Sequence, residues 1–338
     1  MATAKTSTHR QRTLSIGGAT YDVFLTMGEL RTHENNIQLG IGEKVQVKRV
    51  IETCGGGASN TSVGLSRLGL SASFCGIVGS DQWGEKLLEN LKKENVNVSS
   101  ATIVEHETSS FSIVLSLPNG ERTILYAPGV NEHLHDTTFD LGAMKGIDAV
   151  YLNHLCETSC MIQDDIIEAL TKESSTVLAW NPGGSEIAAG MHAEDAAALL
   201  KSTTLLLLNK EEALLFSQSK TIEEALKKLT SAGAKNVCIT DGKNGTIASD
   251  SKKTYRCPIL KNIRVVDTTG AGDAFGTAAL WALLTGETLQ TALISGTLNA
   301  ASVVASIGAQ AGLLTETNIR EQLSRNLISV ETISSQHL

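Results

Sequence analysis

The chain has 338 residues and a formal net charge of −8, so we do not expect nucleic acid, whose backbone requires a basic surface, to be its main partner. Hydrophobic residues make up 41% of the chain, enough for a large core, but no stretch approaches the roughly 18 uninterrupted apolar residues of a membrane-spanning helix. The six cysteines are too sparse for a disulfide framework, and we expect a cytoplasmic globular protein with no membrane partner.

Residues 1–12 are polar and basic, which predicts a disordered tail rather than a secretory signal. From 13 to 330, apolar runs alternate with segments of helical periodicity. The runs predict buried strands at Thr13–Ile16, Ala72–Val78, Ala149–Leu152, Val177–Trp180, Thr204–Leu208 and Val237–Thr240. The other segments predict helices at Asn60–Leu68, Gly84–Asn95, Asp164–Glu173, Ala193–Lys201, Lys210–Ser217 and Thr221–Ala232, and a long helical tail over Gly272–Ile307. This order predicts one α/β domain, a mostly parallel sheet with helices on both faces.

Two insertions interrupt this order, at about 23–53 and 110–127. In the second, apolar residues alternate on both sides of Pro118-Asn119-Gly120, and an Asn-Gly turn between alternating runs is typical of a β-hairpin. In the first, Val45, Val47 and Val50 alternate near the end. Together the insertions predict a small antiparallel sheet outside the main one, placed as a lid over a site.

Two short pairs of metal-binding residue types occur in the chain. Cys156 and Cys160 have the spacing of one helical face, and His133 and His135 lie in a polar stretch. Neither pair is accompanied by a second pair at zinc spacing. We expect no metal site at either.

The sharpest chemical pattern is the segment Val266–Phe275, which reads Val-Asp-Thr-Thr-Gly-Ala-Gly-Asp-Ala-Phe. It follows a β-like run and opens a helix, where small residues leave backbone N–H groups free to bind an anion and the helix dipole adds to the attraction. Asp273 is then placed to accept a proton from a hydroxyl that attacks a phosphoryl group. The alternative is a tight turn with Asp273 as an ordinary helix N-cap.

Two further segments have simpler interpretations when each is taken alone. The Gly-rich turn Gly55–Asn60 opens a helix, and it is compatible with a plain tight connection. It does not complete Gly-x-Gly-x-x-Gly, because Asn60 stands in place of the last glycine, and this argues against a dinucleotide-dependent oxidoreductase. Asn209 and Glu212 form the pattern of a helix N-cap with a capping box.

Taken together, four motifs resemble the ribokinase (PfkB) family of carbohydrate kinases. They are Gly55-Gly56-x-x-x-Asn60, Gly76-x-Val78-Gly79-x-Asp81-x-x-Gly84, Asn209-x-x-Glu212 and Asp267-Thr268-Thr269-Gly270-Ala271-Gly272-Asp273. Their order and spacing hold from about Leu14 to Leu314. The resemblance implies a Rossmann-like, ribokinase-like α/β domain with a β-sheet lid, and a homodimer joined through the lids. It also implies ATP as phosphoryl donor, Mg²⁺ as cofactor, and a sugar or sugar-like alcohol as acceptor.

The resemblance assigns roles to individual residues. Asp273 matches the catalytic base, and Gly270, Ala271 and Gly272 match an anion hole that stabilises charge on the transferred phosphoryl group. The family's sugar-contacting positions match Asp22, Gly56 and Asn60.

Other matching positions concern the nucleotide and its metal ions. Asn209 and Glu212 match a motif that organises magnesium and its waters. Asp267 matches a position that helps to bind an activating potassium ion. The nucleotide side matches Thr240, Gly242 and Gly245 in one loop, and Asn299 with the Ile307-Gly308-Ala309 turn as an adenine-binding wall.

The acceptor is left open by two departures from the ribokinase pattern. Thr20 stands where ribokinases carry Asn, and Gly57-Ala58-Ser59 replaces the typical Lys-Gly-Ala, so ribose specificity is not implied. Aromatic residues make up only 4% of the chain and indicate no base-stacking pocket, which favours a sugar over a nucleoside. The alternatives are an adenosine-type nucleoside kinase of this family and a catalytically inactive sugar-binding regulator. Such a regulator is expected to have lost Asp273, Gly272 or Glu212, and all three are present.

Overall fold

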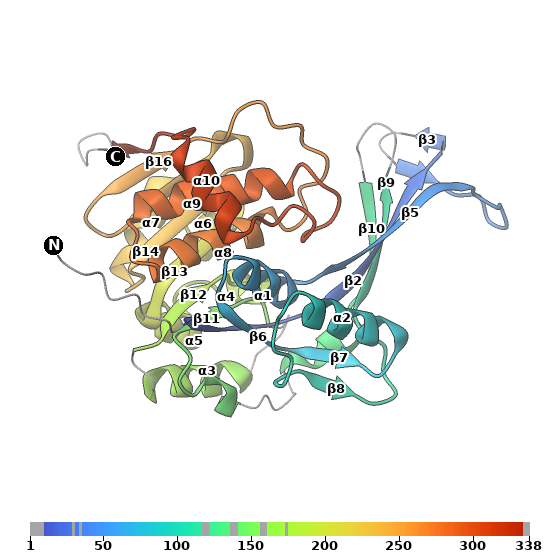
Figure 1. Cartoon of the computed structure of the whole chain (residues 1–338), viewed down its shortest axis with the longest axis horizontal. Coiled ribbons are helices and arrows are strands. Elements are labelled where there is room, and N and C mark those ends of the chain that lie inside the picture. Colours follow the sequence, from blue (N-terminus) through green and yellow to red (C-terminus); the bar gives the residue numbers. More distant parts are fainter. Residues whose placement is uncertain are drawn as a thin grey trace.

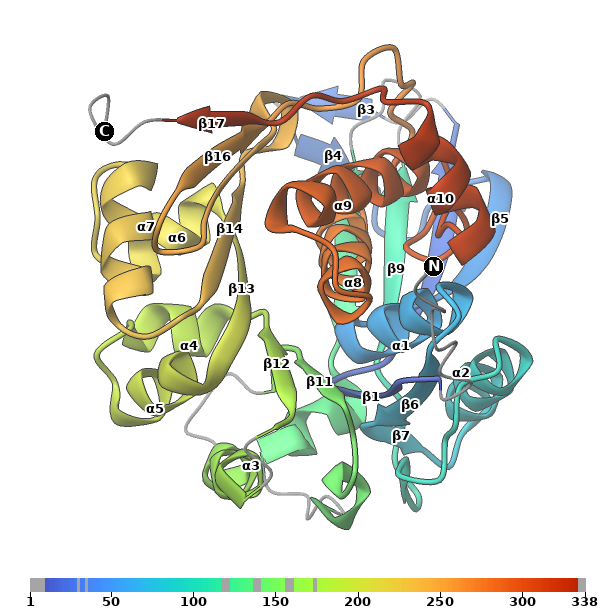
Figure 2. The ribbon, with the colours of Figure 1, turned by 60° about the vertical axis from the view of Figure 1, so that its left-hand side comes forward.

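The computed structural model describes residues 10–28, 31–33, 36–116, 122–135, 141–155, 161–172 and 175–333. Its centre is a sheet of nine described strands in the order β17-β16-β15-β14-β13-β12-β11-β1-β6 (Figures 1 and 2). Parallel pairing joins β6 (Ser71–Cys75), β1 (Arg12–Ile16), β11 (Ala149–Leu152), β12 (Val177–Trp180), β13 (Thr203–Asn209) and β14 (Asn236–Thr240). Antiparallel pairing then adds β15 (Thr246–Ser249), β16 (Thr254–Cys257) and β17 (Glu331–Ile333).

Helices cover both faces of this sheet, as predicted. One face carries α1 (Gly57–Arg67), α2 (Gln82–Lys93), α8 (Ala271–Leu284), α9 (Leu289–Val303) and α10 (Glu316–Ser324). The other carries α3 (Met161–Lys172), α4 (Gly184–Ala189), α5 (Glu194–Ser202), α6 (Lys210–Phe216) and α7 (Ile222–Ser231). Successive residues of β11 alternate between the two cores, since Tyr151 packs in the first and Val150 in the second. The predicted α/β fold is confirmed.

The predicted boundaries need three corrections. Arg12 already pairs with Ser71 in β1, so this strand begins one residue earlier than predicted; residues 1–9 of the predicted tail lie outside the described part. The predicted strand Ala72–Val78 is divided at Gly76, whose missing side chain admits the Gly17 carbonyl 2.2 Å from an ideal Cβ position. Beyond it, β7 (Ile77–Gly79) pairs with β8 (Thr102–Val104).

The third correction concerns the predicted helical tail, which is two helices. Gly286 turns the chain after α8 with a φ of 85°, in the left-handed region that favours glycine. Thr288 then caps α9 by accepting a hydrogen bond from Thr291 N–H. The two helices pack against each other beside the sheet (Figure 2).

The two insertions form a second sheet in the order β10-β9-β2-β5, which projects from the main body as a lid (Figure 1). Its strands are β2 (Thr20–Met27), β5 (Val47–Gly55), β9 (Phe111–Ser116) and β10 (Arg122–Ala127), and β3 (Arg31–His33) pairs with β4 (Asn36–Gln38) at the far end. β9 and β10 are antiparallel as predicted, while their connection, including Pro118-Asn119-Gly120, lies outside the described residues. The lid is not purely antiparallel, because β2 and β9 run parallel.

Three short 3₁₀ helices, η1 (Gly129–His135), η2 (Leu141–Met144) and η3 (Gly242–Asn244), connect described elements. No helix in the described part of the chain is long and apolar enough to cross a bilayer. His133 lies in η1 and contacts Glu107, whereas Cys156 and Cys160 fall outside the described residues.

Candidate active site

The Gly-rich loop before α8 forms the centre of the site. Gly270 caps the helix with a φ of 75°, and an ideal Cβ there would lie 2.3 Å from the Ala309 side chain, so glycine is required twice over. The helix proper opens with the Ala274 N–H donating to the Gly270 carbonyl at 2.9 Å. The N–H groups of Gly272 and Asp273 make no hydrogen bond within the described residues. These free donors at a helix N-terminus form an anion-binding position.

Two cavities meet at this loop. The first, of about 500 Å³, is lined mainly by aliphatic side chains and includes Ala271 and Gly272; we call it the apolar cavity. The second, of about 640 Å³, is lined by amides, carboxylates and small residues and includes Asp273; we call it the polar cavity. The start of α8 therefore separates the two spaces. Because Ala271, Gly272 and Asp273 are consecutive, a group bound in one cavity lies next to a group bound in the other.

The predicted nucleotide loop lies at the apolar cavity. Thr240, Gly242 and Gly245 all line it, from the end of β14 and the turn into β15. Gly245 has a φ of 87°, and an ideal Cβ would lie 2.2 Å from the Cys257 carbonyl, so the turn packs closely on β16. Lys243 in the same turn is the one basic residue among the described residues that line this cavity.

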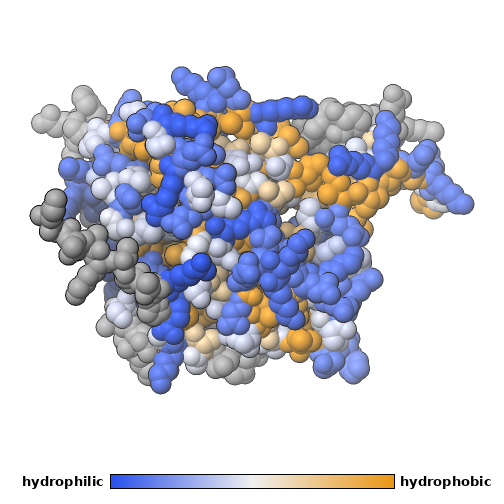
Figure 3. All heavy atoms as spheres, in the orientation of Figure 1, coloured by the Kyte–Doolittle hydropathy of each residue, from blue (hydrophilic) through white to orange (hydrophobic). Residues whose placement is uncertain are grey.

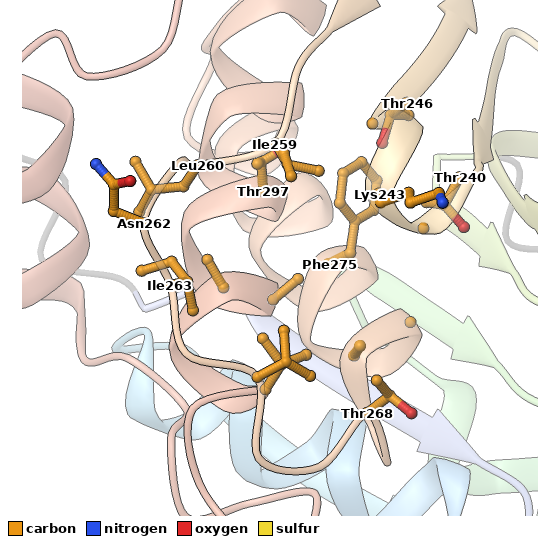
Figure 4. A pocket seen from close by; sticks show the side chains of 18 residues that line it. Thr240, Lys243, Thr246, Ile259, Leu260, Asn262, Ile263, Thr268, Phe275 and Thr297 are labelled. Carbon is orange, nitrogen blue, oxygen red and sulfur yellow. The ribbon is translucent and has the colours of Figure 1, made fainter. Parts of the chain in front are cut away.

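The remaining walls of the apolar cavity come from α8, α9 and the segment after β16. Figure 4 shows Ile259, Leu260 and Ile263 along that segment, facing Phe275 of α8, with Thr268 near the helix start. Ala300, Ala301 and Val304 add the surface of α9. A slot of this size and polarity fits a flat heteroaromatic ring.

The structure does not bring Asn299 to the apolar cavity. Its side chain is fully buried, donating to the Ala274 carbonyl at 2.7 Å and accepting from the Leu314 N–H at 2.8 Å. It links α8 to the chain after α9, while the adjacent Ala300 and Ala301 line the cavity. The proposed contact of the Asn299 side chain with adenine is therefore corrected to a structural role. The Gly308 N–H is likewise turned inward, onto Asp267.

The polar cavity lies where the root of the lid meets the main sheet. Gly56, predicted at a sugar-contacting position, lines it together with Thr20. Gly56 has a φ of 88°, and an ideal Cβ would lie 2.6 Å from the Ala19 Cα, so only glycine lets β5 enter α1 this close to the start of β2. The close approach fixes the wall of the cavity.

Two amide side chains in the wall of the polar cavity have unused acceptors. The Asn131 amide nitrogen donates to the Ala19 carbonyl at 3.3 Å, and the Asn153 amide nitrogen donates to the Ile16 carbonyl at 3.1 Å. The Oδ1 atoms of both residues are buried and have no hydrogen-bond partner within the described structure. Both oxygens are closed off from the cavity surface, so neither is positioned to bind a ligand in this arrangement of the side chains.

Asp273 lines the polar cavity and is held by Asn60. The Asn60 amide donates to Asp273 Oδ2 at 2.8 Å, and its own Oδ1 accepts from Gln310 at 3.1 Å. Burial raises the pKa of Asp273 to about 6, although the hydrogen bond from Asn60 opposes the shift. Asn60 itself is buried and does not line the cavity, so its predicted sugar contact is replaced by a contact with Asp273.

Asp22 lies one step beyond the polar cavity on β2. Thr20, two residues earlier and therefore on the same face of the strand, lines the cavity, but Asp22 does not. Its carboxylate accepts a 2.5 Å hydrogen bond from Ser112 on β9, and burial raises its pKa to about 6. The structure therefore places Asp22 at the lid root, behind the position predicted for a sugar contact.

Asn209 and Glu212 form the capping box that the sequence indicates. Asn209 Oδ1 accepts from the Glu212 N–H at 2.9 Å, and Glu212 Oε2 accepts from the Asn209 N–H at 2.8 Å. Glu212 also lines the polar cavity, and burial raises its pKa. Its second carboxylate oxygen makes no hydrogen bond within the described residues. One free carboxylate oxygen on a residue that shares the polar cavity with Asp273 fits Mg²⁺, which keeps most of its waters and takes few protein ligands.

The residues at Asp267 do not fit a potassium ion. Oδ1 accepts from the Thr269 N–H at 3.0 Å and the Thr269 hydroxyl at 2.8 Å, and Oδ2 accepts from the Gly308 N–H at 3.0 Å. Arg122 of the lid adds a salt bridge to Oδ1. Burial alone would raise the pKa of Asp267, but these hydrogen bonds and the Arg122 charge lower it. Four donors already hold this carboxylate, and one of them, the Arg122 guanidinium, repels any cation placed at Oδ1.

Sequence reasoning missed several residues that the structure places at the site. Asn131, Asn153 and Gln310 carry no motif, and each is brought in by the meeting of distant segments. The segment 259–265 looks like an ordinary apolar connection until it is seen to cover the apolar cavity. The lone polar Asn153 directly after the apolar run of β11 is a signal that could have been used.

Comparisons with known proteins identify the family and the fold of this chain. The family described as pfkB family carbohydrate kinase matches residues 15–316. A ribokinase from Bacillus subtilis is 30% identical over 274 residues, covering 80% of this chain and 87% of that protein. The Arabidopsis thaliana ribokinase solved with ribose and ATP superposes with a TM-score of 0.78 at 22% identity, covering 93% of this chain and 99% of that one. A Burkholderia thailandensis nucleoside kinase solved with inosine gives 0.72 at 20% identity, covering 93% and 98%.

Proposed function

Since the chain belongs to the pfkB family of carbohydrate kinases and is an ATP-dependent enzyme, we propose that it phosphorylates a hydroxyl group of an uncharged sugar. One observation carries the proposal. The free N–H groups of Gly272 and Asp273 and the Asp273 carboxylate lie between an apolar cavity suited to the adenine ring and a polar cavity suited to a polyol.

In this proposal Asp273 is the general base. Its pKa of about 6 leaves it ionised at neutral pH but close enough to neutrality to take a proton in the transition state. The acceptor hydroxyl gives its proton to Asp273 as its oxygen attacks the γ-phosphorus of ATP, and the bond from that phosphorus to the bridging oxygen breaks to release ADP. The loop Gly270–Gly272 receives the charge that develops on the phosphoryl oxygens.

Thr240, Gly242 and Gly245 would contact the nucleotide, and Lys243 would lie near its phosphates. Mg²⁺, when bound, would neutralise phosphate charge. Glu212 would hold it through its free carboxylate oxygen, and the capping box with Asn209 fixes the direction of that oxygen.

The charges of the polar cavity favour a neutral acceptor. Glu132, Glu212 and Asp273 line it, and its described lining includes no Lys or Arg. His154 lines it too, but this ring is paired with Glu186. A sugar phosphate would bring a second anion to a site that already holds carboxylates and the phosphates of ATP.

A nucleoside is the second candidate, and Tyr126 is the observation that favours it. This side chain lines the polar cavity from the lid strand β10 and is 54% exposed, so its ring is free to stack on a base. No Phe, Trp or second Tyr lies among the described lining residues to complete a sandwich, and a sugar remains the better fit.

A panel of neutral sugars, their phosphates and nucleosides, each with ATP and Mg²⁺, tests the proposal through ADP release. The expected result is turnover with a neutral sugar that Asp273→Asn abolishes, and little turnover with the phosphates. Exclusive turnover of a nucleoside would select the second candidate. Strong binding of a sugar without phosphorylation would indicate the inactive sugar-binding regulator, and preference for a sugar phosphate would refute the neutral acceptor.

A further inference from the structure

Arg122 joins the lid to the Gly-rich loop. It is the first residue of β10, and its guanidinium makes two contacts on the main domain. One Nη donates to Asp267 Oδ1, and the other donates to the Thr268 hydroxyl at 3.1 Å. A planar guanidinium held on two successive residues has a fixed orientation. The Arg122 side chain is 32% exposed and that of Asp267 5%, so the pair is partly shielded from water.

Asp267 in turn fixes the shape of the anion-binding loop. Its carboxylate ties the Thr269 N–H on one side to the Gly308 N–H on the other, 41 residues away in the chain. Gly270, directly after Thr269, packs on Ala309, directly after Gly308. The position of the free N–H groups therefore depends on a buried anion that needs a compensating positive charge.

We propose that Arg122 supplies this charge from the lid in place of a potassium ion, so that phosphoryl transfer depends on lid closure and not on a monovalent cation. This inference rests on the proposed function, because it assigns the anion-binding loop to phosphoryl transfer. Arg122 is then a positioning residue. When the lid opens, Asp267 loses its counter-charge and the loop loses a constraint; when the lid closes, both are restored.

Charge compensation by Arg122 has a consequence for any cation near Asp267. The three N–H or O–H donors from Thr269 and Gly308 remain whether the lid is open or closed, since all come from the main domain. The remaining position on Oδ1 belongs to Arg122. Removing the guanidinium therefore removes the positive charge that repels a cation at Asp267, while the wild type keeps that charge in place.

The first test needs no acceptor, so it is independent of the proposed function. Thermal unfolding is compared in potassium chloride and in choline chloride at equal ionic strength for wild type, Arg122→Gln, and Arg325→Gln as matched control. Arg325 forms an exposed ion pair with Glu321 on α10, far from the loop in the chain. We expect no potassium-specific rise in the melting temperature of wild type or control. A potassium-specific rise in wild type would overturn the proposal, because specific binding to the folded state raises it.

The second test uses the acceptor found by the panel. Removing a charge-assisted hydrogen bond costs enough to lower kcat of Arg122→Gln by about 10- to 100-fold, with little change in sugar KM. Arg122→Lys should recover part of the loss, and potassium should raise kcat of Arg122→Gln but not of wild type or Arg325→Gln. Potassium activation of the wild type, or an Arg122→Gln enzyme with wild-type kcat, would overturn the proposal. Failure to find any acceptor would count against the proposed function alone, and the unfolding comparison would still decide this one.

Discussion

The Asn60 amide donates a 2.8 Å hydrogen bond to the Asp273 carboxylate, which joins the start of α1 to the start of α8. This bond lowers the pKa of Asp273 against the effect of burial. Asn60→Ala should therefore raise that pKa above about 6 and move the acid limb of the kcat profile to higher pH. Profiles of kcat against pH for wild type and Asn60→Ala measure the shift.

The control for this prediction is Asn236→Ala. Asn236 likewise donates a hydrogen bond through its side-chain amide, but to a backbone group, the Thr204 carbonyl, at 2.9 Å. It lies in β14 and outside the polar cavity. Its pH profile should overlay that of the wild type. If the Asn60→Ala profile overlays it as well, Asn60 does not act on Asp273.

Asp273→Asn should lose activity and gain stability. Loss of a general base costs about 10² to 10⁴ in kcat. Burial raises the pKa of Asp273 from 3.8 in the unfolded chain to about 6 in the folded protein. The bound proton therefore stabilises the folded state fully below pH 3.8, and this stabilisation is lost as the pH rises through 6. At neutral pH the ionised carboxylate therefore lowers the free energy of unfolding, by roughly 3 kcal/mol.

Denaturant unfolding of wild type and Asp273→Asn at neutral pH and near pH 4 checks the sign. The variant should be more stable at neutral pH, and the difference should shrink in acid. A variant less stable than wild type at neutral pH would show that Asp273 is not held in a desolvating site.

Gly270→Ala and Gly272→Ala form a matched pair two residues apart at the start of α8. At Gly270 the methyl group meets Ala309 and the backbone is left-handed, so we expect a loss of about 2 kcal/mol or more in unfolding free energy. At Gly272 an ideal Cβ meets nothing within 4 Å, so the fold should persist. Its methyl group would stand at the apolar cavity beside the free N–H groups, and kcat should fall. Melting curves and ATP kinetics of both variants separate the two effects.

Glu212→Gln keeps an acceptor for the Asn209 N–H but removes the charge. The capping box should survive, with little change in melting temperature, because a Gln side chain completes the same box. If Glu212 holds Mg²⁺, the variant needs a higher magnesium concentration for half-maximal activity, while sugar KM changes less. A magnesium titration that overlays the wild type would leave Glu212 with the helix cap alone.

The lid is predicted to join two copies of the chain. Arg122 reaches Asp267 and Tyr126 lines the polar cavity, so alternation along β10 directs Leu125 away from the cleft. Leu125 is 53% exposed and Val50 of β5 is 57% exposed, and Figure 3 shows hydrophobic residues along the projecting lid. Sedimentation across a concentration series should show a dimer that Leu125→Glu weakens. A wild type that stays monomeric at every concentration would leave the lid as a flap of one subunit.

The order of helices and strands could be predicted from the sequence because each buried strand is a local apolar run. The run at Leu205–Leu208, for example, lies inside β13 with little displacement at either end. The Gly-rich loop is also local, since Gly270 and Asp273 are close in the chain and their roles follow from a helix start. Both could be predicted without knowing what packs against them.

Contacts between distant segments could not be predicted in this way. Asn60 and Asp273 are 213 residues apart, and Arg122 and Asp267 are 145 apart. The contact predicted for Asn299 is wrong for the same reason. Asn299 lies in a helix as predicted, but the direction of its side chain depends on the position of the Leu314 N–H, which follows α9 in the chain. Which way a polar side chain points is decided by the neighbour that the fold brings to it.

The residues that line the two cavities come from different parts of the sequence. Every lining residue of the apolar cavity falls between 240 and 304, whereas the polar cavity takes its lining from 18 to 183 except for Glu212 and Asp273. In the proposed assignment of the cavities, substitutions within residues 18–183 therefore change which acceptor fits and leave the apolar cavity as it is. The architecture separates what an evolving enzyme needs to keep from what it is free to alter.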